Sequence, residues 1–199
     1  PWVLNHIAAG LDTALWDLAL RSAGRNFAQH QGLEQAEAKT YASSINEPDL
    51  ERLLPIHAGQ GQKHFKLKLG FDADRDRAYV ERAKAIKPAG TQILIDTNQK
   101  WSLPQATAAL NSYADLDIGF SEEPLRADAP KADWEALAKA SPIPLAGGEN
   151  INALDDFLAF VEAGVQVLQP DVAKWGGVSG ALELASRVPQ GVKIWPHFM

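Results

Sequence analysis

The stretch HFKLKLGFDADRDRAYVERAKAIKPAGTQILID (residues 64–96) decides the fold, because a strand, a helix and a second strand follow one another in it. HFKLKLGF alternates apolar residues with Lys66 and Lys68, which is the two-residue period of a β-strand. The segment 74–87 is predicted to be a helix that ends before Pro88. TQILID is a short apolar strand. The stretch therefore predicts one strand–helix–strand unit.

This alternation extends over the whole chain. Helices are predicted at residues 5–23, 48–57, 102–114, 130–140, 153–163 and 177–187, and five further strands are TYASSIN (40–46), DIGFSE (117–122), PIPLAGG (142–148), VQVLQP (165–170) and VKIWPH (192–197). Strands that alternate with helices indicate a parallel sheet in an α/β fold. Without a long linker or composition break, residues 1–199 are expected to form one domain. A doubly wound open sheet is the alternative, but charged residues at every strand end favour a barrel.

The charge and composition of the chain argue against several classes of function. A net charge of −6 argues against a nucleic-acid-binding surface, and the absence of cysteine excludes thiolate metal sites, disulfides and a cysteine nucleophile. No apolar run is long enough to span a membrane, and the chain start lacks the pattern of a signal peptide. We therefore expect a cytoplasmic protein with no nucleic-acid or membrane partner.

Three carboxylates end three consecutive predicted strands. They are Asp96, Glu122 and Glu149, and the charged strand ends from Lys68 to His197 recur at steps of 22 to 28 residues. Carboxylates that converge on one rim repel one another unless a cation lies among them, and all-oxygen ligation favours Mg²⁺. We expect Glu122 rather than its neighbour to be the ligand, since adjacent strand residues point to opposite sides.

Lys66 and Lys68 lie two residues apart and share one face of their strand. An edge strand with solvated lysines is the alternative. If the strand is interior, mutual repulsion and a nearby Mg²⁺ should lower the pKa of a lysine toward neutrality and make it a general base.

The last two strands end in Asp171 and His197, a pair that suits acid–base chemistry because the carboxylate fixes the imidazole tautomer and raises its basicity. Asn98 lies just beyond Asp96, where a substrate contact and a turn role are equally plausible. Lys174 and the glycine-rich stretch at 176–180 are compatible with an anion-binding helix start.

Together these residues resemble the enolase superfamily, and within it the mandelate racemase subgroup. The matching motifs are Lys66-Leu-Lys68, Asp96-Thr-Asn98-Gln, Glu122-Glu-Pro, Gly148-Glu149-Asn, Pro170-Asp171 with Lys174 and Gly-Gly, and His197. The resemblance implies a TIM-like (β/α)7β barrel. It is expected to be incomplete here, because most of an N-terminal α+β capping domain and the last strand are not represented. Both chain ends look cut, and we expect the intact protein to be longer.

The resemblance also implies roles for individual residues. Asp96, Glu122 and Glu149 match Mg²⁺ ligands, Lys68 a base and Lys66 its enolate-stabilising neighbour, and His197 with Asp171 an opposing acid or base. The expected reaction is removal of the α-proton of a hydroxy-carboxylate to give an ene-diolate, followed by loss of water, as in acid-sugar dehydratases. The alternatives are a racemase or epimerase of a 2-hydroxy acid and a catalytically silent metal–carboxylate binding homologue. A small-molecule carboxylate substrate, bound partly by Asn98 and Lys66, and a homo-oligomer are expected.

Overall fold

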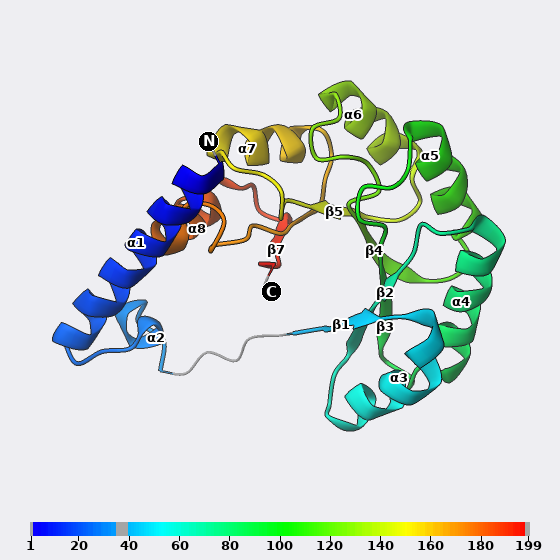
Figure 1. Cartoon of the computed structure of the whole chain (residues 1–199), viewed down its shortest axis with the longest axis horizontal. Helices are drawn as coiled ribbons and strands as arrows, with labels where there is room; N and C mark the ends of the chain where they lie inside the picture. Colours follow the sequence, from blue (N-terminus) through cyan, green and yellow to red (C-terminus); the bar gives the residue numbers. More distant parts are fainter. Residues whose placement is uncertain (1, 35–39, 198–199) are drawn as a thin grey trace. The chain divides into compact units, whose positions relative to one another are not determined.

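The computed structural model describes residues 2–34 and 40–197, which divide into two compact units (Figure 1). The central unit comprises Thr40–Gly147 and Ala159–Val167. The terminal unit comprises Pro1–Lys39, Gly148–Leu158 and Leu168–Met199. The unit boundaries pass through helix α7 (Leu154–Glu162) and strand β6 (Val167–Leu168), so each unit holds part of both elements.

The central unit is built from strands that each precede a helix. Its elements in order are β1 (Ala42–Ile45), η1 (Glu47–Asp49), α3 (Leu50–Gly59), β2 (His64–Lys68), α4 (Ala73–Ile86), β3 (Gln92–Asp96), α5 (Leu103–Ser112), β4 (Ile118–Glu122), α6 (Lys131–Ala140) and β5 (Leu145–Gly147). Figure 1 shows helices α3 to α6 along one side of the strands. Between strands and helices lies an apolar core that includes Phe65, Leu67, Ile93, Ile95, Leu110 and Trp134.

Local sequence signals set the helix ends in this unit. The Asp72 side chain accepts a hydrogen bond from the backbone N–H of Arg75 and so caps the start of α4. Helix α5 begins with a capping box in which Ser102 and Gln105 bond reciprocally. These caps explain why the predicted and observed helix bounds agree closely.

The parallel register places three site candidates in one row. Lys68 pairs with Asp96 across β2 and β3, and Asp96 pairs with Glu122 across β3 and β4. Parallel strands end on the same edge of a sheet, so this row lies at the carboxyl edge of β2–β4. The sequence spacing of these residues therefore corresponds to true neighbours in the sheet.

Strands β6 and β7 (Lys193–Ile194) continue the order. Gln166 N donates to Leu145 O in the central unit, and Trp195 N donates to Leu168 O in the terminal unit. The seven strands thus follow one another in chain order, as in an incomplete TIM-like barrel. The predicted α/β class and all seven predicted strands are confirmed. Among the described residues, no helix has the length and apolar character needed to cross a membrane.

In the terminal unit, helix α1 (Trp2–Ser22) packs along helix α8 (Gly177–Arg187), near the short helix α2 (Phe27–His30). The carboxylate of Asp12 accepts a hydrogen bond from Ser179 N at 3.0 Å, and Trp16 Nε1 donates to Ser179 Oγ at 2.8 Å. Gly177 is required there, because a Cβ atom would meet the Asp12 carboxylate at 2.4 Å. The start of α8, suggested above as an anion site, is therefore occupied by the protein's own carboxylate.

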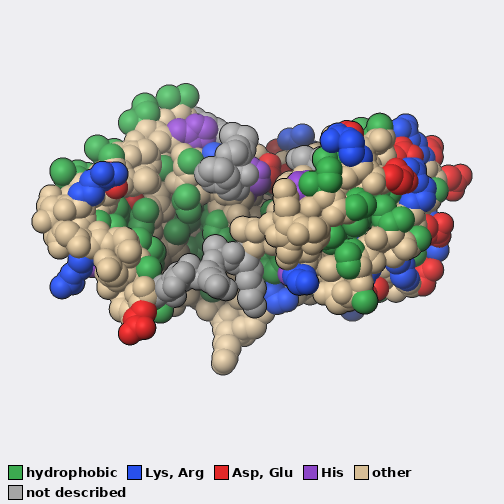
Figure 2. Space-filling view, turned by 90° about the horizontal axis from the view of Figure 1, so that it is seen from below, with side chains coloured by type: hydrophobic (Ala, Val, Ile, Leu, Met, Phe, Trp, Pro, Cys, Tyr) green, Lys and Arg blue, Asp and Glu red, His purple; other side chains and the backbone are tan. Residues whose placement is uncertain are grey.

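Helix α1 faces α8 with Ala9, Asp12 and Trp16, whereas Leu11 and Leu18 of the same helix are 60% and 62% exposed. Figure 2 shows mixed acidic and basic side chains over the α3–α4 surface, which carries ion pairs such as Arg82–Glu51, and largely uncharged atoms over α1. The sequence thus predicted the helix but made no prediction of the side by which it docks.

Candidate functional site

In the central unit, Lys66 lies between two buried carboxylates. Its Nζ atom is 2.6 Å from Glu122 Oε1 and 3.2 Å from Asp96 Oδ2. Lys66 is 2% exposed, Asp96 0% and Glu122 1%. Three charges so deeply removed from water are tolerated only when they compensate one another, and this geometry provides that compensation.

Lys68 approaches the same group from the rim. Its Nζ atom lies 2.6 Å from Asp96 Oδ2 and 2.9 Å from Asn98 Oδ1, and its side chain is 25% exposed. The other Asp96 oxygen, Oδ1, accepts a hydrogen bond from Asn98 N. Asp96 therefore binds both lysines through one oxygen. Lys68 is the lysine that a solute can reach.

The structure corrects the electrostatic prediction for Lys66. Burial alone lowers the pKa of this ammonium group, but the ion pairs with Glu122 and Asp96 outweigh burial and hold its pKa above the usual range. The predicted repulsion between two lysines omitted the carboxylates between which Lys66 is placed. Without a bound cation, the lowered pKa predicted for a lysine is wrong for Lys66, which stays charged.

The Asp96–Glu122 pair has the character of a cation site. Both side chains end neighbouring strands in register, both are buried, and the position between them already holds the positive charge of Lys66. Carboxylate oxygens are the donors that Mg²⁺ prefers. Among residues 2–34 and 40–197, however, no three acidic or histidine side chains gather as a ready metal site. The predicted three-carboxylate ligand set therefore stays a prediction.

The turn after β3 contains Asn98, for which the sequence left a turn role and a substrate contact open. Lys100 N donates to Thr97 O, and the two central residues, Asn98 and Gln99, have φ values of 46° and 63°. Two positive φ values are typical of a type I′ turn, in which asparagine is common but glycine is favoured over glutamine. Glu123, just after β4, also has a positive φ of 41°. Such non-glycine conformations cost about 1–3 kcal/mol each and need support from their surroundings.

In the terminal unit, His197 lies between two carboxylates. Its Nδ1 atom is 3.0 Å from Asp171 Oδ2, and its Nε2 atom is 3.0 Å from Glu149 Oε2. Asp171 is held in turn by the backbone N–H groups of Ala173 and Lys174. The predicted contact between Asp171 and His197 is confirmed, and Glu149 joins it as a partner that the spacing did not indicate.

The two carboxylates favour the protonated imidazole. The hydrogen bond with Glu149 raises the pKa of His197, burial opposes it, and Asp171 raises it further. Burial acts to raise the pKa of Asp171, but His197, the backbone N–H groups and the Lys174 ammonium lower it below the usual range. This cluster therefore stabilises the positively charged form of the imidazole, which can donate a proton.

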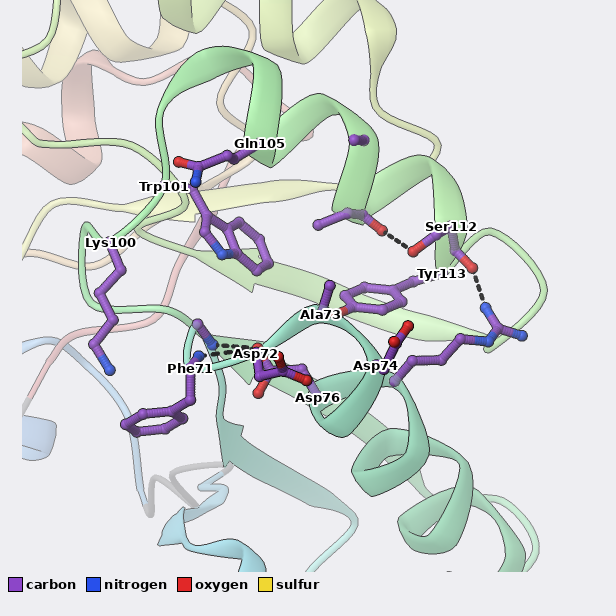
Figure 3. A pocket seen from close by; sticks show the side chains of 14 residues that line it. Phe71, Asp72, Ala73, Asp74, Asp76, Lys100, Trp101, Gln105, Ser112 and Tyr113 are labelled. Carbon is purple, nitrogen blue, oxygen red and sulfur yellow. Dashed lines mark hydrogen bonds between the residues drawn. The ribbon is translucent and has the colours of Figure 1, made fainter.

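Two cavities in the described part of the central unit border the loop after β2, and one of them includes a predicted site residue. A cavity of about 210 Å³ is lined by Lys68 together with Glu47, Arg75 and Asp76. A larger cavity of about 500 Å³ lies between the β2–α4 loop and α5, with Trp101 and Tyr113 among its lining residues (Figure 3).

Asp76 borders both cavities and fixes the loop after β2. Its carboxylate is buried and accepts hydrogen bonds from Gly70 N and Phe71 N, as Figure 3 shows. Lys100 Nζ lies 3.5 Å from the Phe71 ring centroid, which ties this loop to the turn after β3. The surroundings of Lys68 are thus built from two strand-end loops.

Comparison with known proteins supports the fold and shows the family. Residues 50–199 match the family model described as "Enolase C-terminal domain-like". D-galactarolactone cycloisomerase of Agrobacterium fabrum is 27% identical over 95% of this chain and 52% of its own length. Arabinonate dehydratase of Saccharolobus solfataricus is 27% identical over 96% of this chain and 53% of its own length. The chain thus spans about half the length of these curated relatives.

Solved structures of related proteins have the same fold. A crystal structure described as mandelate racemase/muconate lactonizing enzyme from Bordetella bronchiseptica RB50 is 41% identical, with a TM-score of 0.94 over 100% of this chain and 55% of that one. A second, from Bradyrhizobium, described as an enolase complexed with magnesium and mandelic acid, is 26% identical with a TM-score of 0.90, over 98% of this chain and 55% of that one.

Proposed function

The chain belongs to the enolase C-terminal domain-like family, and on this premise we propose that it removes the α-proton of a hydroxy-carboxylate and then eliminates water. The observation that carries the proposal is the charge-compensated row Lys68–Asp96–Glu122, with Lys66 between the two carboxylates. It combines a reachable amine with a buried cation-binding pair. Arabinonate dehydratase, among the relatives, catalyses this type of reaction by name, which favours dehydration.

Asp96, Glu122 and Glu149 would hold a Mg²⁺ ion, as the magnesium complex of the Bradyrhizobium structure suggests. When bound, the ion would supply positive charge that stabilises an ene-diolate and the substrate carboxylate. Lys66, which lies 2.6 Å from Glu122 and 3.2 Å from Asp96, would stabilise the same developing negative charge. Asn98 would contact the substrate beside Lys68, to which its side-chain oxygen is hydrogen-bonded.

The proton steps are assigned to two side chains. Lys68 in its neutral form takes the α-proton as the C–H bond breaks, and the electron pair passes into the ene-diolate. His197, protonated between Glu149 and Asp171, gives its proton to the β-hydroxyl, which leaves as water when the C–O bond breaks. The enol that results tautomerises to a 2-keto acid, so that atoms and charge balance.

A racemase or epimerase is the second candidate, because the Bradyrhizobium structure contains mandelic acid, a 2-hydroxy acid without a β-hydroxyl group. In that case the ene-diolate would be reprotonated at the α-carbon instead of losing hydroxide. The two reactions share the first step and differ only in the group that receives the second proton.

Incubation with a library of sugar acids and Mg²⁺ in D₂O distinguishes the candidates. Formation of a 2-keto acid supports dehydration, whereas deuterium at the α-carbon with inversion supports the racemase. Absence of both products and of α-proton exchange would overturn the proposal.

Variants test the roles of Lys68 and His197 in proton transfer. Lys68→Ala and His197→Ala are each expected to lower turnover by about 10²-fold or more. Lys139→Ala, which removes an exposed lysine of α6, is the matched control and should leave turnover unchanged. Wild-type turnover in both site variants would contradict the assignment.

A further inference from the structure

The side chain of Gln99 connects the turn after β3 to the end of β4 and to the loop that follows it. Its Nε2 atom donates to Glu123 Oε2 at 3.0 Å, and its Oε1 atom accepts from Ala127 N at 3.1 Å. The backbone of Gln99 adds a third link, since its N–H donates to Glu123 O at 2.8 Å. One residue in the turn after β3 thus holds both the end of β4 and the loop beyond it.

Nearby backbone contacts extend this connection. Thr97 N donates to Glu122 O, and Thr97 Oγ1 donates to Glu123 O at 3.0 Å. Glu123 is buried, and its own N–H donates to Ala146 O on β5. These hydrogen bonds connect Thr97 and Gln99, which follow Asp96, to Glu123, which follows Glu122.

The backbone conformation at Gln99 indicates why glutamine rather than glycine stands at this position. With φ at 63°, this position of a type I′ turn is one that glycine occupies with less strain than any side chain. Glutamine gives the turn itself no advantage there. What glutamine adds is the pair of side-chain hydrogen bonds to Glu123 and Ala127, which glycine cannot make.

We propose that Gln99 is a positioning residue that clamps the ends of β3 and β4 and so fixes the spacing of the Asp96 and Glu122 carboxylates for a divalent cation. The inference deepens the proposed function, on which its cation part rests. Residues that support metal ligands through such hydrogen bonds typically change metal affinity by about 10- to 100-fold when they are removed.

Gln99→Gly separates positioning from folding, because it removes the clamp while it gives the turn its preferred residue. We expect Mg²⁺ affinity, measured by calorimetry on the purified protein, to fall roughly 10- to 100-fold. The melting temperature without Mg²⁺ should change little, because relief of the positive φ value offsets the two lost hydrogen bonds. Gln99→Gly affinity within twofold of the wild type would overturn the inference.

Gln166→Ala is the matched control. Gln166 also accepts a hydrogen bond from a backbone N–H, that of Leu145 at 2.8 Å, but it does not contact the strand-end cluster. This variant should melt at a lower temperature and keep the wild-type Mg²⁺ affinity. An equal loss of affinity in both variants would show a general structural effect and would also overturn the inference.

Amide hydrogen exchange tests the clamp without metal. Exchange at Ala127 N–H should be at least about 10-fold faster in Gln99→Gly, whereas Gln166→Ala, which leaves Gln99 in place, should exchange like the wild type. If the wild type binds no Mg²⁺, the cation part of the proposed function fails, and exchange still decides whether Gln99 holds the loop. Unchanged exchange at Ala127 in Gln99→Gly refutes the clamp.

Discussion

The two units treat their charged side chains differently. In the central unit an ammonium group lies fully buried between two carboxylates, whereas in the terminal unit an imidazole lies between two carboxylates with 14% of its surface still exposed. The pKa of the buried ammonium group is raised although burial, the largest single effect, lowers it. The pKa of the imidazole is also raised, and burial is a smaller influence there than the hydrogen bond with Glu149. The buried ion pairs thus keep Lys66 charged, whereas partial exposure allows His197 to exchange a proton.

The largest expected difference comes from removing the charge at Lys66. Lys66→Met should destabilise the protein by about 3–5 kcal/mol, because Glu122 would remain buried without its cation and Asp96 would keep only Lys68. Addition of Mg²⁺ should restore part of this loss in urea unfolding, since the ion replaces the missing charge. A loss below about 1 kcal/mol would show that these carboxylates are not held as the structure indicates.

A pair of identical substitutions compares the packing of the two units. Leu110 on α5 is fully buried, and Leu11 on α1 is 60% exposed. Leu110→Ala should cost about 2–5 kcal/mol of unfolding free energy through lost contacts and a residual cavity. Leu11→Ala should stay within about 0.5 kcal/mol. Equal effects in thermal or urea unfolding would show that the exposed face of α1 is packed in solution.

High pH should deprotonate tyrosines in the central unit alone, because this unit contains all three of them. Burial, assisted by Asp76, raises the pKa of Tyr113 to about 12. Because an unfolded tyrosine has a pKa of about 10, the neutral hydroxyl contributes stability that is complete below about pH 10 and lost as pH rises toward 12.

The shift corresponds to about 2–3 kcal/mol at most. Urea unfolding at pH 8 and pH 11 should show a smaller alkaline loss in Tyr113→Phe than in the wild type. An identical pH dependence in the two proteins would exclude Tyr113 as a source of the alkaline loss.

The smallest expected effect concerns the contact between α1 and α8. Asp12→Ala should cost about 0.5–2 kcal/mol, because it removes the acceptor for an N-terminal N–H of α8. Asp17→Ala, which breaks an exposed pair with Arg21 on the same helix, should cost no more than about 0.5 kcal/mol. Similar values for both, measured by thermal unfolding, would show that the Asp12 contact adds nothing specific.

The strands and helices were predictable because their signals are local. Alternation around Lys66, Pro88 after α4 and Ser102 before α5 each determine structure within a few residues. Even spacing also placed Lys68, Asp96 and Glu122 in one row, since equal strand–helix units bring strand ends to the same edge.

What the sequence did not reveal depends on contacts between distant residues. The raised pKa of Lys66 arises from carboxylates that follow it by 30 and 56 positions, and their distances decide whether attraction exceeds desolvation. The role of Gln99 depends on Glu123 and Ala127, which lie beyond the next helix. The docking side of α1 depends on Ser179, so the periodicity of α1 alone could not predict it.

The link between Asp12 and Ser179 has a consequence for the order of folding during synthesis. Its partners are separated by 167 residues, so α1 cannot make this contact until Ser179 has also been translated. At about 5–20 residues per second this interval is roughly 10 to 30 s. Helix α1 is thus synthesised well before the surface on which it docks.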